Sequence, residues 1–494
     1  MRQQRFGNSA KSSGNLHGRS FNYDRAPVPP GTKVAGVLTA RASPIWRRLL
    51  EALWAYAEAQ PRLHALWRGS ATALIIAVIS AGLRWSLQVL IARWLGASAF
   101  GDYSYALVMA QILTVVAGFG IGASVVKFIP GYMARGDWGL IRGLVMRSRQ
   151  LTAASSLLLA VVTIAAVRIV EPQRFEVGSL MMGAVLIPFV ALSGLEQELG
   201  RARERILMTY ALPLILQPVL EMAALGGLWI LSGRLDPVRA IGIRIATVAL
   251  VLAPQMASLR SALPRAVRRA KPIYDNRGWM SVGLLMLVTY IGVTLSSRAD
   301  LLVLGWFRPA DDVGVYSAAV MISGLVGLLV AAAGTRAGPM FSNLFARGQR
   351  RELELCAQGA SRLTFWLSLP LIVALAALGK PLLAVFGHDF GRGYSALLIL
   401  LVGQLSNAAM GPIGVLLLMT GFERTTAMVV AGSATLDLVA ALVLVPRLGM
   451  VGAAVASMLA ATGWNVAIAV SAKSALGIDP VALWRRESSS DETS

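Results

Sequence analysis

The stretch ASAFGDYSYALVM (97–109) aligns with ADDVGVYSAAVMI (310–322) at an offset of 213 residues. Gly101, Tyr103, Ser104 and Ala106 fall on Gly314, Tyr316, Ser317 and Ala319. Each copy follows one long apolar run and opens the next. The match predicts two halves of the same topology, a parallel repeat whose axis lies along the membrane normal. A chance match of a few small residues is the alternative.

The composition predicts that most of this chain lies in lipid. Of 494 residues, 56% are hydrophobic and only 14% are charged, whereas a soluble domain carries about 25% charged residues. The apolar runs do not alternate and are about 20 residues long, which is the length of a helix that crosses a hydrocarbon core. We therefore expect an all-α polytopic membrane protein, because only helices and closed barrels satisfy their backbone in lipid.

The apolar runs predict about twelve transmembrane helices in two six-helix halves. The expected spans are roughly 71–92, 102–126, 148–168, 177–199, 207–232, 238–259, 279–305, 313–340, 362–386, 393–420, 425–446 and 449–472. The expected organisation is a basic tail (1–70), an N-terminal half (71–260), a basic linker (261–277), a C-terminal half (278–474) and a second tail (475–494).

The first tail has two parts of different character. Residues 1–43 are rich in Gly, Ser, Pro and Arg without any period, which is typical of disorder. Residues 44–60 place apolar side chains on one helical face, so we expect an interfacial helix lying on the membrane. An ordinary amphipathic helix packed against the bundle is the alternative.

The distribution of basic residues predicts the orientation. The net charge is +21, and most loop arginines and lysines lie on the side of the first tail. The central linker alone holds Arg265, Arg268, Arg269, Lys271 and Arg277. Cytoplasmic loops carry this excess, so both termini are expected in the cytoplasm, and the charge does not indicate a nucleic-acid partner.

Several kinds of chemistry find no support in the sequence. Cys356 is the single cysteine, and the three histidines (His17, His64 and His388) lack metal-ligand spacing. The pair Gly379-Lys380 is followed by proline and forms no phosphate-binding loop. We expect no metal, no cofactor and no ATP hydrolysis, which leaves an ion gradient or downstream consumption as the driving force. The outer loops are too short for the catalytic loop of a membrane polymerase or ligase, so we do not expect an enzyme.

Four stretches resemble one family of transporters. They are LGASAFGDYSYAL after the first span, GFGIGASVVKFIPGYMARGD (118–137), RADLLVLGWFRPADDVGVYSAA (298–319) and LVPRLGMVGAAVAS (444–457). They resemble the polysaccharide exporters, which are flippases of lipid-linked oligosaccharides in the multidrug/oligosaccharidyl-lipid/polysaccharide exporter superfamily. The resemblance covers about residues 70–475.

The resemblance implies a V-shaped bundle of two six-helix halves in a bacterial inner membrane. It implies movement of an undecaprenyl-pyrophosphate-linked sugar chain to the outer leaflet, for O-antigen, capsule or exopolysaccharide biosynthesis. The implied partners are this lipid-linked substrate, membrane lipids and the machinery of polymerisation and export. The alternative function is a multidrug/cation antiporter of the same superfamily, whose site would favour acidic residues.

Two arginines lie inside the apolar runs at related positions. The repeat offset places Arg84 one residue from Arg298, and each precedes an outer-loop arginine by nine or ten residues. At 1.5 Å per residue both lie about 15 Å below the outer interface. Two such arginines could clamp one diphosphate, since a guanidinium binds phosphate oxygens in pairs. Gln88 shares a helical face with Arg84 and joins this candidate site.

The remaining intramembrane polar residues have two interpretations each. Asp300 could bind a coupling proton or sodium ion, or it could pair with Arg84 across the cleft. Glu221 and Asp437 are further candidates for ion coupling, although a structural ion pair of either acid with Arg298 is the alternative. Asn407 could bind sugar hydroxyls, although polar side chains more often join helices to one another.

Overall fold

The computed structural model describes residues 61–170, 174–203 and 211–479. The chain divides into two units, Met1–Ala71 and Thr72–Ser494. Within the first unit only the start of α3 (Pro61–Ala117) is described. The predicted disordered segment 1–43, the predicted interfacial helix 44–60 and most of the second tail therefore lie outside the described residues.

Every described element is a helix, as the composition predicts. The N-terminal half contains α3, α4 (Ile121–Arg135), α5 (Trp138–Val170), α6 (Val177–Arg201), η1 (Leu212–Leu216), α8 (Gln217–Ser232) and α9 (Pro237–Ala262). After α10 (Arg265–Arg269), the C-terminal half contains α11 (Asn276–Ser296), α12 (Ala299–Phe307), α13 (Ala310–Ala346), α14 (Arg350–Ala377), α15 (Gly379–Ala384), η2 (His388–Gly393), α16 (Tyr394–Met410), α17 (Ile413–Met419), α18 (Glu423–Leu448) and α19 (Met450–Leu476).

The expected number of about twelve crossings is confirmed. In the described residues, 11 helices are long and apolar enough to span a membrane. The first of them, Ile79–Ala117, has 39 residues and is kinked at Gly96, whose φ of 78° lies in the left-handed region. This kink divides α3 into two crossings, because 39 residues far exceed the roughly 20 that one crossing needs.

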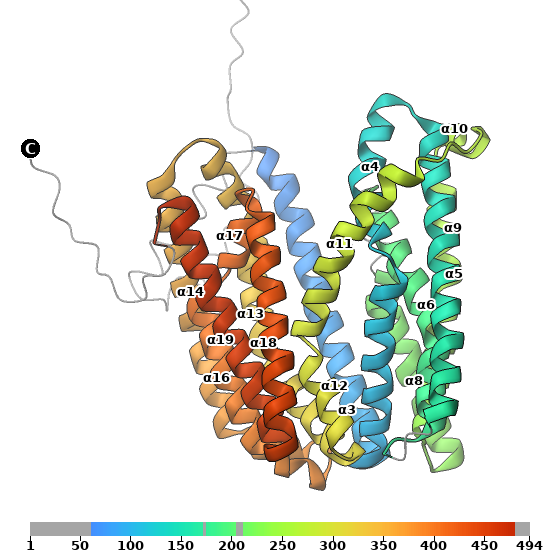
Figure 1. Ribbon diagram of the computed structural model, residues 1–494, viewed down its shortest axis with the longest axis vertical. Helices are drawn as coiled ribbons and strands as arrows, with labels where there is room; N and C mark the ends of the chain where they lie inside the picture. The colour runs from blue at the N-terminus through green and yellow to red at the C-terminus, as the bar shows by residue number, and fades with distance from the viewer. Residues whose placement is uncertain (1–60, 171–173, 204–210, 480–494) are drawn as a thin grey trace, which may run out of the picture. The chain divides into compact units, whose positions relative to one another are not determined.

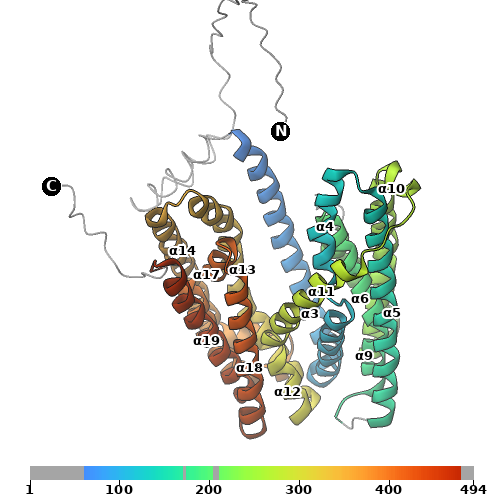
Figure 2. The ribbon, with the colours of Figure 1, turned by 45° about the horizontal axis from the view of Figure 1, so that its top comes forward.

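The helices of each half pack mainly against one another. In the N-terminal half α6 packs against both α5 and α9, and in the C-terminal half α19 packs against both α16 and α18. Both ribbon views show these two groups of helices (Figures 1 and 2). The two-half architecture predicted from the repeat is therefore present.

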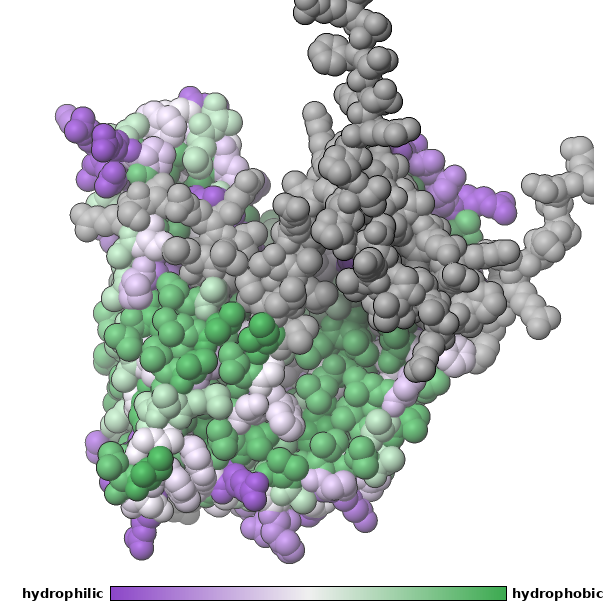
Figure 3. Space-filling model, turned by 180° about the vertical axis from the view of Figure 1, so that it is seen from behind, coloured by the Kyte–Doolittle hydropathy of each residue, from purple (hydrophilic) through white to green (hydrophobic). Residues whose placement is uncertain are grey.

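The outward faces of the spanning helices are apolar. Leu158 and Val161 of α5 are each 64% exposed, and Leu231 of α8 is 88% exposed. Figure 3 shows apolar residues over the middle of one face, with hydrophilic residues at its two ends. Exposed apolar side chains in this number are expected where lipid, not water, is the solvent.

The expected seventh span, 279–305, is broken into α11 and α12. Ser297 and Arg298 separate the two helices, and Arg298 has φ −144° and ψ −7°. The Ser297 hydroxyl donates to the main-chain oxygens of Val293 (3.1 Å) and Thr294 (3.0 Å). Such bonds can bend a helix, but Ser317 makes the same kind of bond within the continuous helix α13. Hydropathy does not reveal the break.

Two further crossings are interrupted at glycines with positive φ. The second crossing breaks after Ala117 at Phe119 (φ 46°) and Gly120 (φ 63°), and the tenth breaks at Gly411 (φ 63°) before Pro412. At Gly120 the backbone of α11 comes close, since a Cβ atom there would stand 2.0 Å from the Gly283 oxygen. Only glycine permits both this conformation and this approach.

The repeated motif forms a close contact between the two halves. A Cβ atom on Gly101 would stand 1.7 Å from the main-chain oxygen of Ala310, and one on Gly314 would stand 2.1 Å from that of Ala97. Because Ala97 and Ala310 also differ by 213 residues, these are the same contact made in both directions. The helix starts of the two copies therefore cross backbone to backbone about a pseudo-twofold axis.

The segment between the halves is fixed to α5. Nη1 of Arg142 donates to the main-chain oxygens of Arg268 (2.8 Å) and Ala270 (2.7 Å). The Ile273 amide donates to the Gly139 oxygen at 3.0 Å. The expected basic linker 261–277 thus contains the short helix α10 and is held along its length by the N-terminal half.

Candidate functional site

A buried polar cluster lies in the N-terminal half. We name Tyr103, Glu221 and Arg244, with Arg84 and Gln88 beside them, the N-terminal cluster. Nη1 of Arg244 lies 3.4 Å from the Tyr103 hydroxyl oxygen and 3.4 Å from Oε1 of Glu221. Gln88 hydrogen-bonds Tyr103, and Arg84 lies within electrostatic range of Arg244. Helices α3, α8 and α9 thus bring two arginines and one glutamate into one cluster.

A second buried cluster lies in the C-terminal half. We name Asp300, Tyr316, Asp437 and Ser457, with Arg298 beside them, the C-terminal cluster. The Tyr316 hydroxyl donates to Oδ2 of Asp300 at 2.5 Å, and the Leu301 amide donates to Oδ1 at 2.7 Å. Ser457 hydrogen-bonds both Asp300 and Tyr316. Asp437 is 0% exposed, hydrogen-bonds the main chain of Asp300 and interacts electrostatically with its carboxylate.

The two clusters occupy equivalent places in the two halves. Three pairs of positions correspond: Tyr103 with Tyr316, Arg244 with Ser457, and Glu221 with Asp437. The first two pairs are each 213 residues apart, and each acid lies 12 residues before the glycine that ends its helix. The acid of the N-terminal cluster has an arginine partner, whereas the acid of the C-terminal cluster has a second carboxylate as its neighbour. The N-terminal cluster therefore holds two arginines and one carboxylate, and the C-terminal cluster holds one arginine and two carboxylates.

The structure does not bring the two predicted arginines together. Arg84 is exposed and its Nη2 lies 3.4 Å from the Ser80 hydroxyl. Arg298 lies at the break between α11 and α12, beside Asp300, and its Nε is buried without a hydrogen-bond partner. Each arginine thus belongs to the cluster of its own half.

Two of the partnerships that the sequence left open as alternatives are not formed in this structure. Asp300 bonds Tyr316 and does not pair with Arg84, because the break at Ser297 turns α12 so that its first residues face α13 and α18. Glu221 pairs with Arg244 and not with Arg298, since α8 packs against α9 in its own half. Asp300 and Asp437, two of the proposed coupling residues, do share one cluster.

The amide residues divide between the clusters and the helix contacts. Gln88 belongs to the N-terminal cluster. Asn407 lies in the last turn of α16, where its main-chain oxygen accepts the amide of Gly411 at 3.0 Å, and it belongs to neither cluster. Asn465 of α19 donates to Ser406 of α16 at 3.4 Å, so it joins two helices.

Arg244, Tyr103, Tyr316 and Ser457 were not among the predicted site residues. The repeat already aligned the two tyrosines, and applying its offset to Arg244 gives Ser457. Arg244 also stands seven residues inside the apolar α9, where a charged side chain is costly and normally functional. Depth and offset together would have identified these residues.

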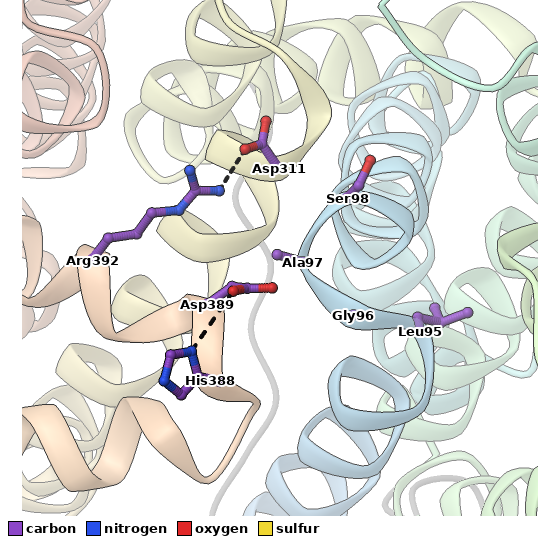
Figure 4. A pocket seen from close by; sticks show the side chains of 8 residues that line it. All are labelled: Leu95, Gly96, Ala97, Ser98, Asp311, His388, Asp389 and Arg392. Carbon is purple, nitrogen blue, oxygen red and sulfur yellow. Dashed lines mark hydrogen bonds and ion pairs between the residues drawn. The ribbon is translucent and has the colours of Figure 1, made fainter.

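The contact between the halves closes a region near Gly96. A pocket of about 620 Å³ lies between the turn at Gly96 and the η2 segment. Its lining comprises Leu95, Gly96, Ala97, Ser98, Asp311, His388, Asp389 and Arg392 (Figure 4). Arg392 donates to Asp311 at 2.5 Å. Nearby, Nη1 of Arg174 donates to the Trp306 oxygen at 2.7 Å and so ties the N-terminal half to α12.

The two clusters are suited to different ligands. Guanidinium groups bind phosphate oxygens in pairs, so the N-terminal cluster suits an anion. Carboxylates and hydroxyls at a broken membrane helix are typical of sites for protons and sodium ions, so the C-terminal cluster suits a cation. Among the described residues, no three Asp, Glu, His or Cys side chains are grouped closely enough to hold a metal ion.

Solved structures show the same fold. An inward-facing multidrug resistance MATE family transporter of the MOP superfamily superposes with a TM-score of 0.67 at 13% identity, covering 82% of this chain and 98% of that one. The lipid II flippase MurJ in an inward closed conformation gives 0.66 at 15% identity, covering 81% and 87%. At these identities the likeness concerns the fold alone.

Sequence comparisons identify the family. The chain is 24% identical over 400 residues to the probable low-salt glycan biosynthesis flippase Agl15 of Haloferax volcanii, covering 80% of each protein. The MatE family model matches residues 286–443. The model of the polysaccharide biosynthesis proteins matches residues 66–345, which is more than half of the chain. This multi-pass membrane protein therefore belongs to the polysaccharide biosynthesis protein family.

Proposed function

We propose that the chain is a flippase that moves a polyprenyl-pyrophosphate-linked oligosaccharide across the inner membrane of a bacterium. The substrate would travel from the cytoplasmic to the periplasmic leaflet by alternating access, during synthesis of an O-antigen, capsule or exopolysaccharide, and would then pass to the polymerisation and export machinery. The family and the flippase named in Haloferax support this function. The observation that carries it is the presence of Arg84, Arg244 and Arg298 inside the spanning region, because basic groups there favour an anionic substrate.

The orientation in this proposal places both termini in the cytoplasm. The support is the basic segment around α10, where Arg265, Arg268, Arg269 and Lys271 are all exposed. Loops with this excess of basic residues remain on the cytoplasmic side. The contact at Gly101 and Gly314 then lies toward the periplasm.

The substrate clamp proposed here consists of Arg84 and Arg298, one from each half. Alternating access would have to bring them onto one diphosphate, because they lie in separate clusters in this structure. We expect Arg84→Ala and Arg298→Ala each to abolish polymer export while the protein still inserts. Lysine at either position should restore less export than its charge suggests, because it lacks the planar fork.

The test measures surface polymer in a strain lacking the chromosomal copy, with membrane insertion checked by blotting. Arg135→Ala is the control, since Arg135 is exposed and its contacts are with its close neighbours in the chain, Asp137 and the ring of Tyr132. Normal polymer levels in both the Arg84 and the Arg298 variants would contradict the clamp.

Ion coupling is assigned to the C-terminal cluster. Asp300 and Asp437 are both buried and interact electrostatically. Two such carboxylates share a proton or bind a cation more readily than both remain ionised. Glu221 is the weaker coupling candidate because it already has Arg244 as a partner.

Sodium binding to this cluster can be measured directly. Sodium chloride should raise the melting temperature of the detergent-solubilised protein above that in choline chloride of equal ionic strength. A ligand at 100 times its Kd stabilises a protein by about 2.7 kcal/mol. Asp437→Asn should remove this difference while leaving the fold intact. The coupling ion is a proton if the wild type melts at the same temperature in both salts, but lowering the pH shifts the melting temperature of the wild type and not that of Asp437→Asn.

The same cluster supports the alternative function. The MatE match includes Asp300 and Asp437, and a buried carboxylate pair could bind an organic cation. An antiporter would lower the sensitivity of cells to cationic drugs without any effect on surface polymer. A deletion strain that keeps its polymer and gains drug sensitivity would favour this alternative over the flippase.

A further inference from the structure

We propose that Arg244, with Arg84 and Tyr103, forms a phosphate-binding site inside the N-terminal half, and that Glu221 pairs with Arg244 whenever no phosphate is bound. Binding of the phosphate group would displace the Glu221 carboxylate, which would then take up a proton. This inference rests on the proposed function, since the phosphate would belong to the lipid-linked substrate.

The pairing of Arg244 with Glu221 is incomplete. The two groups share one contact of 3.4 Å, Nε of Arg244 is buried without a partner, and Glu221 also hydrogen-bonds Gln217 and Tyr103. Arg149 and Glu196 show what a complete pair looks like in this protein, with two parallel bonds of 2.6 and 2.8 Å. A buried polar atom without a partner costs about 1–3 kcal/mol, so the N-terminal cluster has unused capacity for a ligand.

The charge of the cluster indicates an anion. The charged group that faces Glu221 is Arg244 from α9, while Tyr103 from α3 and Gln217 from α8 hydrogen-bond the carboxylate. Arg84 from α3 lies within electrostatic range of Arg244. Two arginines and one carboxylate leave the cluster with a net positive charge. Arg84 is exposed and 26% of the Arg244 side chain is exposed, so a ligand can reach both. Two guanidinium forks and one hydroxyl match the oxygens of a phosphate or diphosphate.

Exchange at Arg244 would link substrate binding to proton uptake. In the empty site the Arg244 cation is balanced by Glu221. When a phosphate oxygen takes that place, the carboxylate is left 1% exposed and without a basic partner. Burial strongly disfavours an isolated carboxylate, so one proton would bind to Glu221 for each phosphate group bound and would leave with it.

The experiment measures binding to the full-length chain in detergent by titration calorimetry at pH 6 and pH 8. The probes are inorganic pyrophosphate, farnesyl pyrophosphate and phosphatidylglycerol. Arg244→Gln should weaken pyrophosphate binding at least tenfold, and Arg244→Lys should weaken it several-fold while keeping the charge. Glu221→Gln should bind pyrophosphate more tightly than the wild type. Its affinity should change between pH 6 and pH 8 only as far as the titration of pyrophosphate itself requires. Arg135→Gln is the control for surface charge.

The outcomes separate this site from the proposed function. Tighter binding of farnesyl pyrophosphate than of phosphatidylglycerol, lost in Arg244→Gln, supports a lipid diphosphate as the ligand. Equal binding of phosphatidylglycerol would assign the site to bulk lipid and overturn the inference. Pyrophosphate binding that requires Arg298 but not Arg244 would also overturn it, yet would leave the flippase intact. A wild-type protein that binds organic cations and no pyrophosphate would overturn both.

Discussion

Single ion pairs in this protein differ sharply in how fully they are formed. The Arg149–Glu196 pair is bidentate, and Glu196 is 0% exposed. Arg135 and Asp137, in contrast, pair at the surface with exposed side chains. Surface pairs contribute about 0–1 kcal/mol, whereas removing one member of a buried pair costs about 3–5 kcal/mol. The first pair is thus a structural element of the N-terminal half.

This difference predicts the effect of substitutions at the pair. Arg149→Met should lower the free energy of unfolding by about 3–5 kcal/mol, because it leaves Glu196 buried and alone. The double variant Arg149→Met/Glu196→Met should recover much of this loss. Asp137→Ala should change stability by less than about 1 kcal/mol. Unfolding in mixed detergent and SDS measures all three, and a double variant worse than the single one would contradict this account.

At the scale of single residues, the sequence identified the intramembrane charges but not their neighbours. Arg84, Arg298, Asp300, Glu221 and Asp437 were all recognised from their positions in apolar runs. Their partners could not be predicted, because a side chain on one helix meets others through packing that spacing along the chain does not specify. The partner of Asp300 is a tyrosine, a residue that hydropathy treats as ordinary.

At the scale of helices, length and hydropathy predicted the crossings, while local backbone chemistry set the breaks. The first described helix runs from Pro61, ten residues before the expected start of the first span. The break at Ser297 comes with a change of backbone conformation at Arg298, and the one at Gly120 comes with a close neighbour. Neither feature alters the apolar pattern from which the spans were read.

The crossing of α3 and α13 predicts a strict requirement for glycine. Gly101→Ala should destabilise the protein by about 1–3 kcal/mol or more, because its Cβ would overlap the Ala310 oxygen. Gly82→Ala on the same helix is the matched control, since nothing lies within 4 Å of a Cβ there. Thermal unfolding in detergent compares the two. An equal effect of both substitutions would show that the crossing does not form in the membrane.

At the scale of the whole chain, the repeat predicted the two halves, and the contact between them shows how they meet. The pocket near Gly96 has Ser98 on one half and Asp389 on the other (Figure 4). Alternating access requires these two halves to separate on this side. The connection through α10 cannot supply the motion, because it is held against α5.

A cross-link across this pocket should therefore stop transport. We expect Ser98→Cys/Asp389→Cys, in a Cys356→Ser background, to lose export when joined by a short cleavable bismaleimide and to regain it after cleavage. The pair Asp311→Cys/Asp389→Cys, within one half, is the control. Export that continues in the fully cross-linked Ser98/Asp389 variant would contradict opening at this position.

The crossing at Gly101 and Gly314 also bears on the ancestry of the chain. A homodimer of six-helix subunits would make this contact isologously, with one glycine against its own copy. If the gene for such a subunit were duplicated and fused, the two glycines could mutate independently. The close backbone contact would still require glycine at both positions. The Arg244/Ser457 position shows the other result of such independence, since there one copy carries an arginine and the other a serine.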